Sequence, residues 1–247
     1  MVLKRVALLA ADTARSQAYI QALVAHDLFP ETVITLGVEP RSEPDTEPRP
    51  TEWQGIFLPD LSQSVPATCR RAGIPMIECT VADVNSEAAA AAVRQSGADI
   101  VIYSGRGGQI VAEAVLGLGP VFLHMHSGWL PDYRGSTTVY YSLLNGQPPG
   151  VTAITLDRTI DTGPIVARRQ YPVPPAGMDV DRLYDSAIRA DLLIRVMKEY
   201  QRTGQLQKEE QPVSAGSTYY VIHPVLKHIA ILSLAAGTTA AAEQADR

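Results

Sequence analysis

Apolar runs of strand length recur through the first half of the chain, with helical patterns between them. The predicted strands are Arg5–Leu9, Thr32–Leu36, Ile74–Cys79, Asp99–Tyr103 and Val121–Met125. The predicted helices cover about 13–26, 86–97 and 110–116, judged from apolar positions at helical spacing and from capping residues. Because strands that alternate with helices pair in parallel, this order predicts a doubly wound, parallel sheet.

The pattern changes in the second half of the chain. Gly150–Leu156 and Ile165–Tyr171 are strand-like runs on either side of a polar turn, and we expect them to be antiparallel to their neighbours. A long amphipathic helix follows from about Asp179 to Tyr200. The predicted fold class is therefore α/β: a Rossmann-like, doubly wound, mostly parallel sheet with late antiparallel strands and a C-terminal helix.

Two segments interrupt these patterns. Between Val38 and Trp53, four prolines lie among acidic residues, which predicts a surface loop without regular structure. Beyond Ala235 the chain is rich in alanine, threonine and glutamate, and we expect a frayed end. We expect residues 1–202 to form the catalytic domain, and residues 203–247 to be an extension that packs on this domain or on a partner subunit.

Composition narrows the possible classes of function. The 247 residues are 46% hydrophobic and 19% charged, and the formal net charge is -5. A protein that follows nucleic-acid phosphates needs a basic face, so a small-molecule substrate is favoured. Cys69 and Cys79 form neither a disulfide framework nor a CxxC metal motif. Since the sequence shows no apolar run of membrane-span length and no signal-peptide pattern, the expected location is the cytoplasm.

A glycine-rich segment, Tyr103–Gln109, lies directly after a predicted strand and before a predicted helix. Glycines at such a place let backbone N–H groups approach a ligand. The segment does not match the GxGxxG dinucleotide pattern, and a plain tight turn explains it equally well. By itself, it identifies no ligand.

His124 and His126 lie at the end of a predicted strand. Residues two apart in a strand face the same side, so both imidazoles should meet at the carboxyl edge of the sheet, where open α/β sheets bind ligands. Core packing would explain a single histidine here. Two on one face, followed by the polar segment Ser127–Gly135, favour an active site.

Asp161 lies in the polar turn Asp157–Pro164 between the two late strands. Turn geometry alone explains aspartate and glycine at such a place. A carboxylate near an imidazole also fixes its tautomer and raises its basicity, as general acid–base catalysis requires. A His-x-His pair with an aspartate is also a possible set of metal ligands, although the other candidate ligands, His223 and His228, are close to the C-terminus.

Several motifs, in this order, resemble those of the folate-dependent formyltransferase family, which includes glycinamide ribonucleotide, methionyl-tRNA and sugar N-formyltransferases. The motifs are His124-Met-His126, Leu130-Pro-Asp-Tyr-Arg134-Gly135, Leu143-Leu-Asn-Gly146, Gly150-Val-Thr152 and Asp161-Thr-Gly163. The resemblance extends over roughly Met1 to Arg202. The chain departs from the family at His124, where the family has asparagine. It also departs at Arg106-Gly-Gly-Gln109, where the family offers bulky apolar residues to the pterin ring.

The resemblance implies a set of site residues and assigns none of them to a metal. The residues it assigns to catalysis are His124, His126 and Asp161. Those it assigns to folate binding are Gly105, Gly107, Gln109, Ile110, Leu156 and Asp157. Those it assigns to acceptor binding are Ser127, Tyr133, Arg134 and Gly135.

The resemblance also implies a reaction, the transfer of a formyl group from 10-formyltetrahydrofolate to an amine of a small molecule, such as an amino sugar on a nucleotide carrier. His126 and His124 would hydrogen-bond the formyl oxygen as negative charge develops on it. Asp161 would orient His126 or a water and help to pass the amine's proton to the folate nitrogen. Arg134 would bind a phosphate or carboxylate of the acceptor.

Three alternatives remain open at this point. They are hydrolysis of the formyl-folate, a metal-dependent hydrolase that uses His124 and His126 as ligands, and a non-catalytic ligand-binding homologue. The chain lacks the length for the separate tRNA-binding domain of a methionyl-tRNA formyltransferase, so no nucleic acid is expected as a partner. No membrane is expected as a partner either, since the sequence shows no apolar run of membrane-span length. A homodimer through the segment Tyr219–Leu234 is a further expectation.

Overall fold

The computed structural model describes residues 1–38, 48–212 and 216–245, with side chains as far as Ala235. Its main sheet contains β1 (Val2–Ala11), β2 (Phe29–Leu36), β5 (Met76–Cys79), β6 (Ile100–Ser104), β7 (Val121–His126), β9 (Gly150–Thr155) and β10 (Ile165–Gln170). Two small sheets pair β3 (Thr51–Trp53) with β4 (Ile56–Leu58), and β8 (Tyr133–Gly135) with β11 (Ser217–Tyr219).

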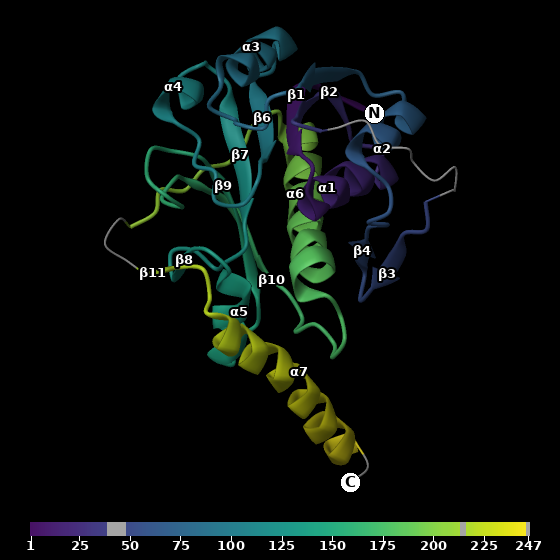
Figure 1. Ribbon diagram of the computed structural model, residues 1–247, viewed down its shortest axis with the longest axis vertical. Helices are drawn as coiled ribbons and strands as arrows, with labels where there is room; N and C mark the ends of the chain where they lie inside the picture. The colour runs from purple at the N-terminus through teal and green to yellow at the C-terminus, as the bar shows by residue number, and fades with distance from the viewer. Residues whose placement is uncertain (39–47, 213–215, 246–247) are drawn as a thin grey trace.

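The strand order of the main sheet is β10-β9-β7-β6-β1-β2-β5 (Figure 1). Neighbouring strands from β7 to β5 are parallel, whereas β9 is antiparallel to both β7 and β10. The expected α/β fold, mostly parallel with late antiparallel strands, is confirmed.

Helices cover both faces of this sheet (Figure 1). They are α1 (Ala14–Ala25), α2 (Val65–Ala72), α3 (Glu87–Ser96), α4 (Glu113–Leu116), α5 (Thr138–Leu144), α6 (Asp185–Thr203) and α7 (Pro224–Ala245), with a π-helical turn, η1 (Val180–Tyr184), before α6. In β1, Leu8 and Ala10 join the core under α1 and α6, while Ala7 and Leu9 join the core under α3 and α4. Because both faces of β1 are buried, its sequence is a continuous apolar run rather than an alternating one.

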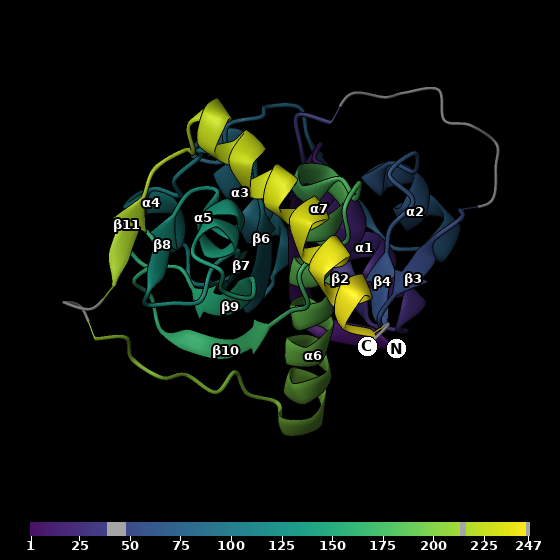
Figure 2. The ribbon, with the colours of Figure 1, turned by 90° about the horizontal axis from the view of Figure 1, so that it is seen from below.

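The segment after α6 packs against the rest of the chain through backbone pairing and helix packing. Glu209 and Ile165 exchange two backbone hydrogen bonds of 2.8 Å. β11 pairs in parallel with β8, and α7 packs on α5. Seen from below, α7 crosses the lower side of the molecule (Figure 2). Among the helices that the structure describes, none is long and apolar enough to span a bilayer.

The expectation of an irregular loop from Val38 to Trp53 is wrong at its end. Residues 39–47 lie outside the described residues, but the last three residues of the expected loop form β3. Gln54 and Gly55 have φ angles of 49° and 75°, so they make the tight reversal that joins β3 to β4. The turn at Gln54 and Gly55 allows β3 and β4 to pair, and the prediction of a loop did not take this turn into account.

Several helices also differ from those predicted from the sequence. α2 and α5 were not predicted, and α4 begins at Glu113 instead of Ile110. The reason is Asn85, which donates to the carbonyl of Ile110 at 2.9 Å and accepts the N–H of Ala112 at 2.7 Å, so that this stretch is not helical. α7 continues past Ala235, contrary to the expected frayed end, and alanine's high helix propensity accounts for this.

Candidate active site

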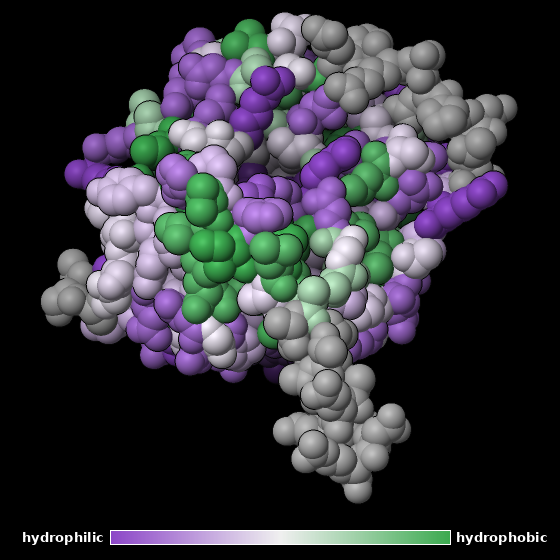
Figure 3. Space-filling view, turned by 60° about the horizontal axis from the view of Figure 1, so that its bottom comes forward, coloured by the Kyte–Doolittle hydropathy of each residue, from purple (hydrophilic) through white to green (hydrophobic). Residues whose placement is uncertain are grey.

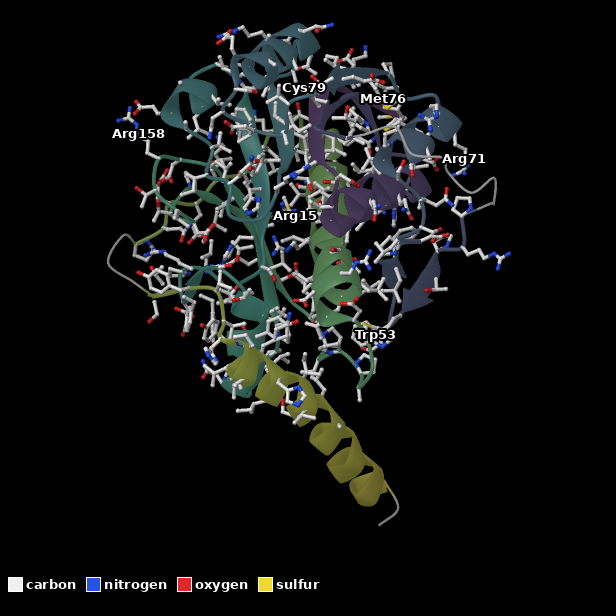
Figure 4. All side chains as sticks on the ribbon, viewed as in Figure 1. Arg15, Trp53, Arg71, Met76, Cys79 and Arg158 are labelled. Carbon is white, nitrogen blue, oxygen red and sulfur yellow. The ribbon has the colours of Figure 1, made fainter. Side chains whose placement is uncertain are left out.

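A cavity of about 410 Å³ opens at the carboxyl ends of β6 and β7. Its lining comes from the loop after β6, the end of β7, the turn between β9 and β10, the segment after β11, and two arginines on helices, Arg15 and Arg189. Figure 4 shows Arg15 near the centre of the molecule, at the start of α1. Segments distant in the sequence thus meet at the sheet edge where doubly wound folds bind ligands.

His126 is held at both ring nitrogens. Its Nε2 lies 2.7 Å from the carbonyl oxygen of Tyr133, and its Nδ1 lies 3.4 Å from Oδ1 of Asp161. Because a carbonyl only accepts, Nε2 carries a hydrogen, and in a neutral ring Nδ1 would then face a carboxylate oxygen without a proton between them. Burial lowers the pKa of His126, and the Asp161 carboxylate opposes that shift. The Asp161 carboxylate is therefore placed to stabilise a proton on Nδ1 whenever His126 accepts one.

The backbone around Asp161 fixes its carboxylate. Asp161 has a φ of 56°, and its Oδ2 accepts the N–H of Gly135 at 2.8 Å. Gln211 Nε2 donates to the carbonyls of Asp161 and Gly163 at 3.2 and 2.6 Å. Gly163 is required there, because a Cβ would clash with the carbonyl oxygen of Thr155. The turn that carries Asp161 is thus built into the sheet edge.

His124 lines the same cavity and lies two residues before His126 in β7, so both side chains are on the same face of the strand. Its Nδ1 is buried without a hydrogen-bond partner in the described part of the chain. Burial lowers its pKa well below 6.5, and the charges of Arg15, Arg189 and His126 lower it further. His124 is therefore a neutral imidazole at neutral pH, able to donate from one nitrogen only.

The residues that the resemblance assigns to folate are mostly brought together. Those that line the cavity are Gly107, Gln109, Ile110, Leu156 and Asp157. Gly105 does not line it, and its carbonyl accepts a hydrogen bond from Arg15. Gln109 donates through Nε2 to the carbonyl of Ala82 at 3.1 Å, while its Oε1 is buried without a hydrogen-bond partner among the described residues. The loop therefore presents an unused acceptor.

The residues assigned to the acceptor are divided. Ser127 and Gly135 line the cavity, but Tyr133 and Arg134 do not. Arg134 is 8% exposed, and its Nη2 donates to the carbonyl of Pro212 at 3.3 Å. Alternate residues of a strand face opposite sides, so the β8–β11 pairing turns this guanidinium away from the face of Gly135. The position expected at the cavity mouth is thus inside the protein.

Several lining residues were missed in the sequence, among them Arg15, Arg189 and Tyr220. For Arg189 a signal existed, since a charged residue lies inside the otherwise apolar and buried run of α6. A charge at such a place needs a partner or a function. Arg15 and Tyr220 carry no comparable signal, because only the folded chain brings them to the cavity.

His124, His126 and Asp161 each offer a ligand atom, and these atoms lie within 4.8 Å of one another. Two atoms that both bind one zinc ion over bonds of about 2.0–2.2 Å must lie closer together than 4.8 Å. Ligand atoms at the upper end of the observed spacing would therefore have to approach one another. Arg15 and Arg189 also line the cavity and would repel a divalent cation. The donor set is chemically suitable for zinc, but the two arginines oppose added positive charge at this place.

Known proteins resemble this chain in both sequence and structure. The methionyl-tRNA formyltransferase of Chloroflexus aurantiacus is 39% identical over 109 residues, which cover 42% of this chain and 34% of that protein. This chain thus spans about a third of the length of that curated relative.

Two solved structures share the fold. The sugar N-formyltransferase of Shewanella sp. has a TM-score of 0.55 and 17% identity, with 92% of this chain and 86% of that chain covered. The N-formyltransferase of Helicobacter canadensis, described in complex with folinic acid and dTDP-3-aminofucose, has a TM-score of 0.51 and 17% identity. Its alignment covers 87% of this chain and 70% of that chain.

The sequence model of one family, described as formyl transferase, matches residues 49–196. This match contains the ends of β6 and β7, the turn with Asp161 and most of α6. It therefore covers more than half of the chain and most of the residues that line the cavity, whereas Arg15 and the segment after β11 lie outside it. This chain belongs to the formyl transferase family.

Proposed function

We propose that the chain transfers a formyl group from 10-formyltetrahydrofolate to the amine of a small molecule, namely an amino sugar on a nucleotide carrier. The observation that carries the proposal is the buried His126–Asp161 pair, with Nδ1 and Oδ1 3.4 Å apart, in the wall of a cavity that the family match covers. The Helicobacter canadensis relative, described with folinic acid and a dTDP-amino sugar, supports both the donor and the acceptor class.

The cavity has features that suit a reduced folate. Its volume of about 410 Å³ lies in the ordinary range for small-molecule sites. Ile110 and Leu156 offer apolar surface, and the unpartnered Oε1 of Gln109 offers an acceptor for an N–H group of a pterin ring. A buried acceptor without a partner is costly, so a ligand donor there would be favourable. These residues would hold the donor, which supplies the formyl carbon.

In the proposed step, a bond forms between the amine nitrogen and the formyl carbon, and the bond from that carbon to the folate nitrogen breaks. A proton leaves the amine and returns to the folate nitrogen, so charge and atoms balance. The neutral ring of His126 can accept that proton on Nδ1, and the Asp161 carboxylate, 3.4 Å away, would stabilise the charge that results. His124 lines the same cavity, and in the tautomer that carries a hydrogen on its unpartnered Nδ1 it would donate to the formyl oxygen.

A small acceptor suits the chain better than a transfer RNA does. The formal net charge of -5 disfavours a polyanion. The alignment with the methionyl-tRNA formyltransferase of Chloroflexus aurantiacus spans only 34% of that protein, so its name does not carry its substrate to this chain. Two free cysteines, Cys69 and Cys79, agree with work in the cytoplasm, where thiols stay reduced.

The test uses the purified full chain with 10-formyltetrahydrofolate and a set of dTDP-amino sugars, and mass spectrometry of the acceptor. Formylated acceptor that disappears in the Asp161→Asn variant is the expected result. Titration with folinic acid, a stable donor analogue, should show saturable heat. Absence of both binding and product would overturn the proposal, while formate released without an acceptor would indicate a formyl-folate hydrolase.

A metal-dependent hydrolase is the second candidate, because His124, His126 and Asp161 cluster. Elemental analysis of protein purified without chelators separates the two. Stoichiometric zinc that is lost in His124→Asn would favour the hydrolase. Activity that survives exhaustive chelation would favour formyl transfer.

We also propose that α7 mediates a homodimer. Figure 3 shows an apolar patch where α7 joins the body, and its exposed members are Val225, Leu226, Ile229 and Leu232. We expect a second copy of this chain to cover the patch, because the patch is continuous with the exposed residues Tyr220 and Val221 of the cavity wall. Light scattering should give twice the chain mass, and Ile229→Asp should give a monomer. A wild-type monomer at high concentration would refute the dimer.

A further inference from the structure

We propose that Arg15 and Arg189 form an anion-binding subsite in the floor of the cavity, and that the acceptor carries a carboxylate or phosphate next to its reacting amine. The inference rests on the proposed formyl transfer and adds the charge class of the acceptor. Neither arginine was among the residues that sequence motifs assigned, and both line the cavity together with His124 and His126.

Arg15 is a cation whose two hydrogen-bond acceptors are uncharged. Its Nε donates to Oγ of Ser104 at 3.3 Å, and its Nη2 donates to the carbonyl of Gly105. Both acceptors are neutral, and in the part of the chain that the structure describes Arg15 makes no ion pair. Burial lowers the pKa of Arg15, and the charge of Arg189 lowers it further. These surroundings leave a guanidinium that an anion would stabilise.

Arg189 reaches the same cavity from the opposite part of the sequence. Its Nη1 donates to the carbonyl of Met125, the residue between the two histidines, at 3.0 Å. Its Nε lies 2.9 Å from Oδ2 of Asp185, and Ser127 donates to Oδ1 of that carboxylate. The side chains of Arg189 and Asp185 are only 15% and 16% exposed. This guanidinium is therefore fixed in place beside the end of β7.

The ion pairs of this part of the cavity leave one positive charge over. Arg189 pairs with Asp185, and Asp161 faces His126, whereas Arg15 takes part in no ion pair among the described residues. His124 is neutral. Arg15 is therefore the cation with which a bound anion would pair.

A carboxylate or a phosphate fits this excess of charge. Guanidinium groups present planar pairs of N–H donors that match the oxygens of both anions, and such charge-assisted hydrogen bonds are the strong ones. Arg189 bonds the peptide between the histidines, and Arg15 bonds the end of the neighbouring strand β6. The bound anion would therefore lie close to the reacting pair and would align the amine of the same molecule with it.

Inorganic phosphate and acetate, titrated separately into the full chain, test the subsite and distinguish its two possible anions. We expect one of them to bind saturably by calorimetry, and Arg15→Gln or Arg189→Gln to weaken it about 10-fold or more. The matched control is Arg195→Gln on the same helix, because Arg195 pairs with Asp191 at i,i+4 as Arg189 pairs with Asp185, yet it is 49% exposed and outside the cavity. The control should bind like the wild type.

A purely structural role for Arg189 has a different signature. In that case Arg189→Gln would lower the melting temperature, and Arg15→Gln would leave anion affinity unchanged. Arg189→Lys keeps a charge beside Asp185 but loses the planar fork, so we expect a stable protein with weakened anion binding. Equal affinity for wild type, Arg15→Gln and Arg189→Lys would overturn the subsite.

Folinic acid, titrated into the same samples, separates this inference from the proposed function. We expect it to bind with unchanged affinity when the subsite is saturated with phosphate or acetate. Competition between the two would assign the arginines to the carboxylates of the donor and refute the inference. Anion binding without folinic acid binding would leave the subsite standing and remove the formyl-transfer proposal.

Discussion

The two walls of the cavity are built on different principles. One wall is the end of β7, where His126 is 4% exposed and is held at both nitrogens, with Arg189 bonded to the peptide beside it. The other wall follows β11, where Tyr220 is 80% exposed and Val221 is 75% exposed. Groups that must be positioned for chemistry thus lie on buried strands, whereas the exposed segment can vary with the acceptor.

The largest expected effect is on the strand wall. His126→Ala and Asp161→Asn should each lower kcat by at least about 100-fold, because each removes one member of the pair that would take up the amine's proton. The double variant should lose little more than either single variant, since the two groups act as a unit. Steady-state kinetics on all three proteins check this. Strict additivity of the two losses in activation free energy would show that the residues have separate roles.

The pairing of β8 with β11, which joins the two walls, has the next largest expected effect. Gly135 has a φ of 96°, and a Cβ there would clash with the carbonyl of Tyr219 in β11. Gly135→Ala should cost about 2–3 kcal/mol of unfolding free energy, and should also reduce activity because the N–H of Gly135 holds Asp161. Gly146→Ala is the control, since Gly146 has a φ of 63° but open space at its Cβ, and should cost only about 1 kcal/mol. Chemical denaturation measures both, and equal losses would mean that strain rather than the clash dominates.

Protonation of the strand wall should destabilise the fold. His124 and His126 both have pKa values lowered in the folded state, chiefly by burial, so the unfolded chain binds more protons below about pH 6.5. Stability is therefore complete above that pH and is lost as the pH falls toward the lowered values, with a slope of up to about 1.4 kcal/mol per pH unit for each histidine. His124→Asn should flatten this slope and leave a working enzyme. The exposed His228 provides the control His228→Asn, which should leave the slope unchanged; unchanged slopes in both variants would contradict the assignment.

The sequence predicted the strand wall better than the other one, for a physical reason. His124 and His126 are two residues apart in β7, so strand geometry places both on one face at the carboxyl end of that strand. Asp161 comes from the turn after β9, which is antiparallel to β7, and the order of the motifs rather than sheet geometry predicted that it joins them. The direction of Arg134 depends instead on the pairing of β8 with β11, which joins segments far apart in the chain. Arg15 likewise becomes a lining residue only through its hydrogen bonds to the end of β6. Long-range pairing of this kind leaves no local pattern in one sequence.

The smallest expected effect is on the exposed wall, at Tyr220. Its carbonyl accepts hydrogen bonds from Thr137 at 3.4 Å and Tyr141 at 3.2 Å, so the backbone stays anchored when the side chain is removed. Tyr220→Ala should therefore raise KM for the acceptor by a few fold, through the loss of apolar contact, and leave kcat and the melting temperature unchanged. Val173→Ala, at an exposed residue outside both the cavity lining and the proposed dimer patch, is the control and should change neither constant. A fall in kcat for Tyr220→Ala with KM unchanged would contradict the roles assigned to the two walls, because it would place a group needed in the transition state on the exposed wall.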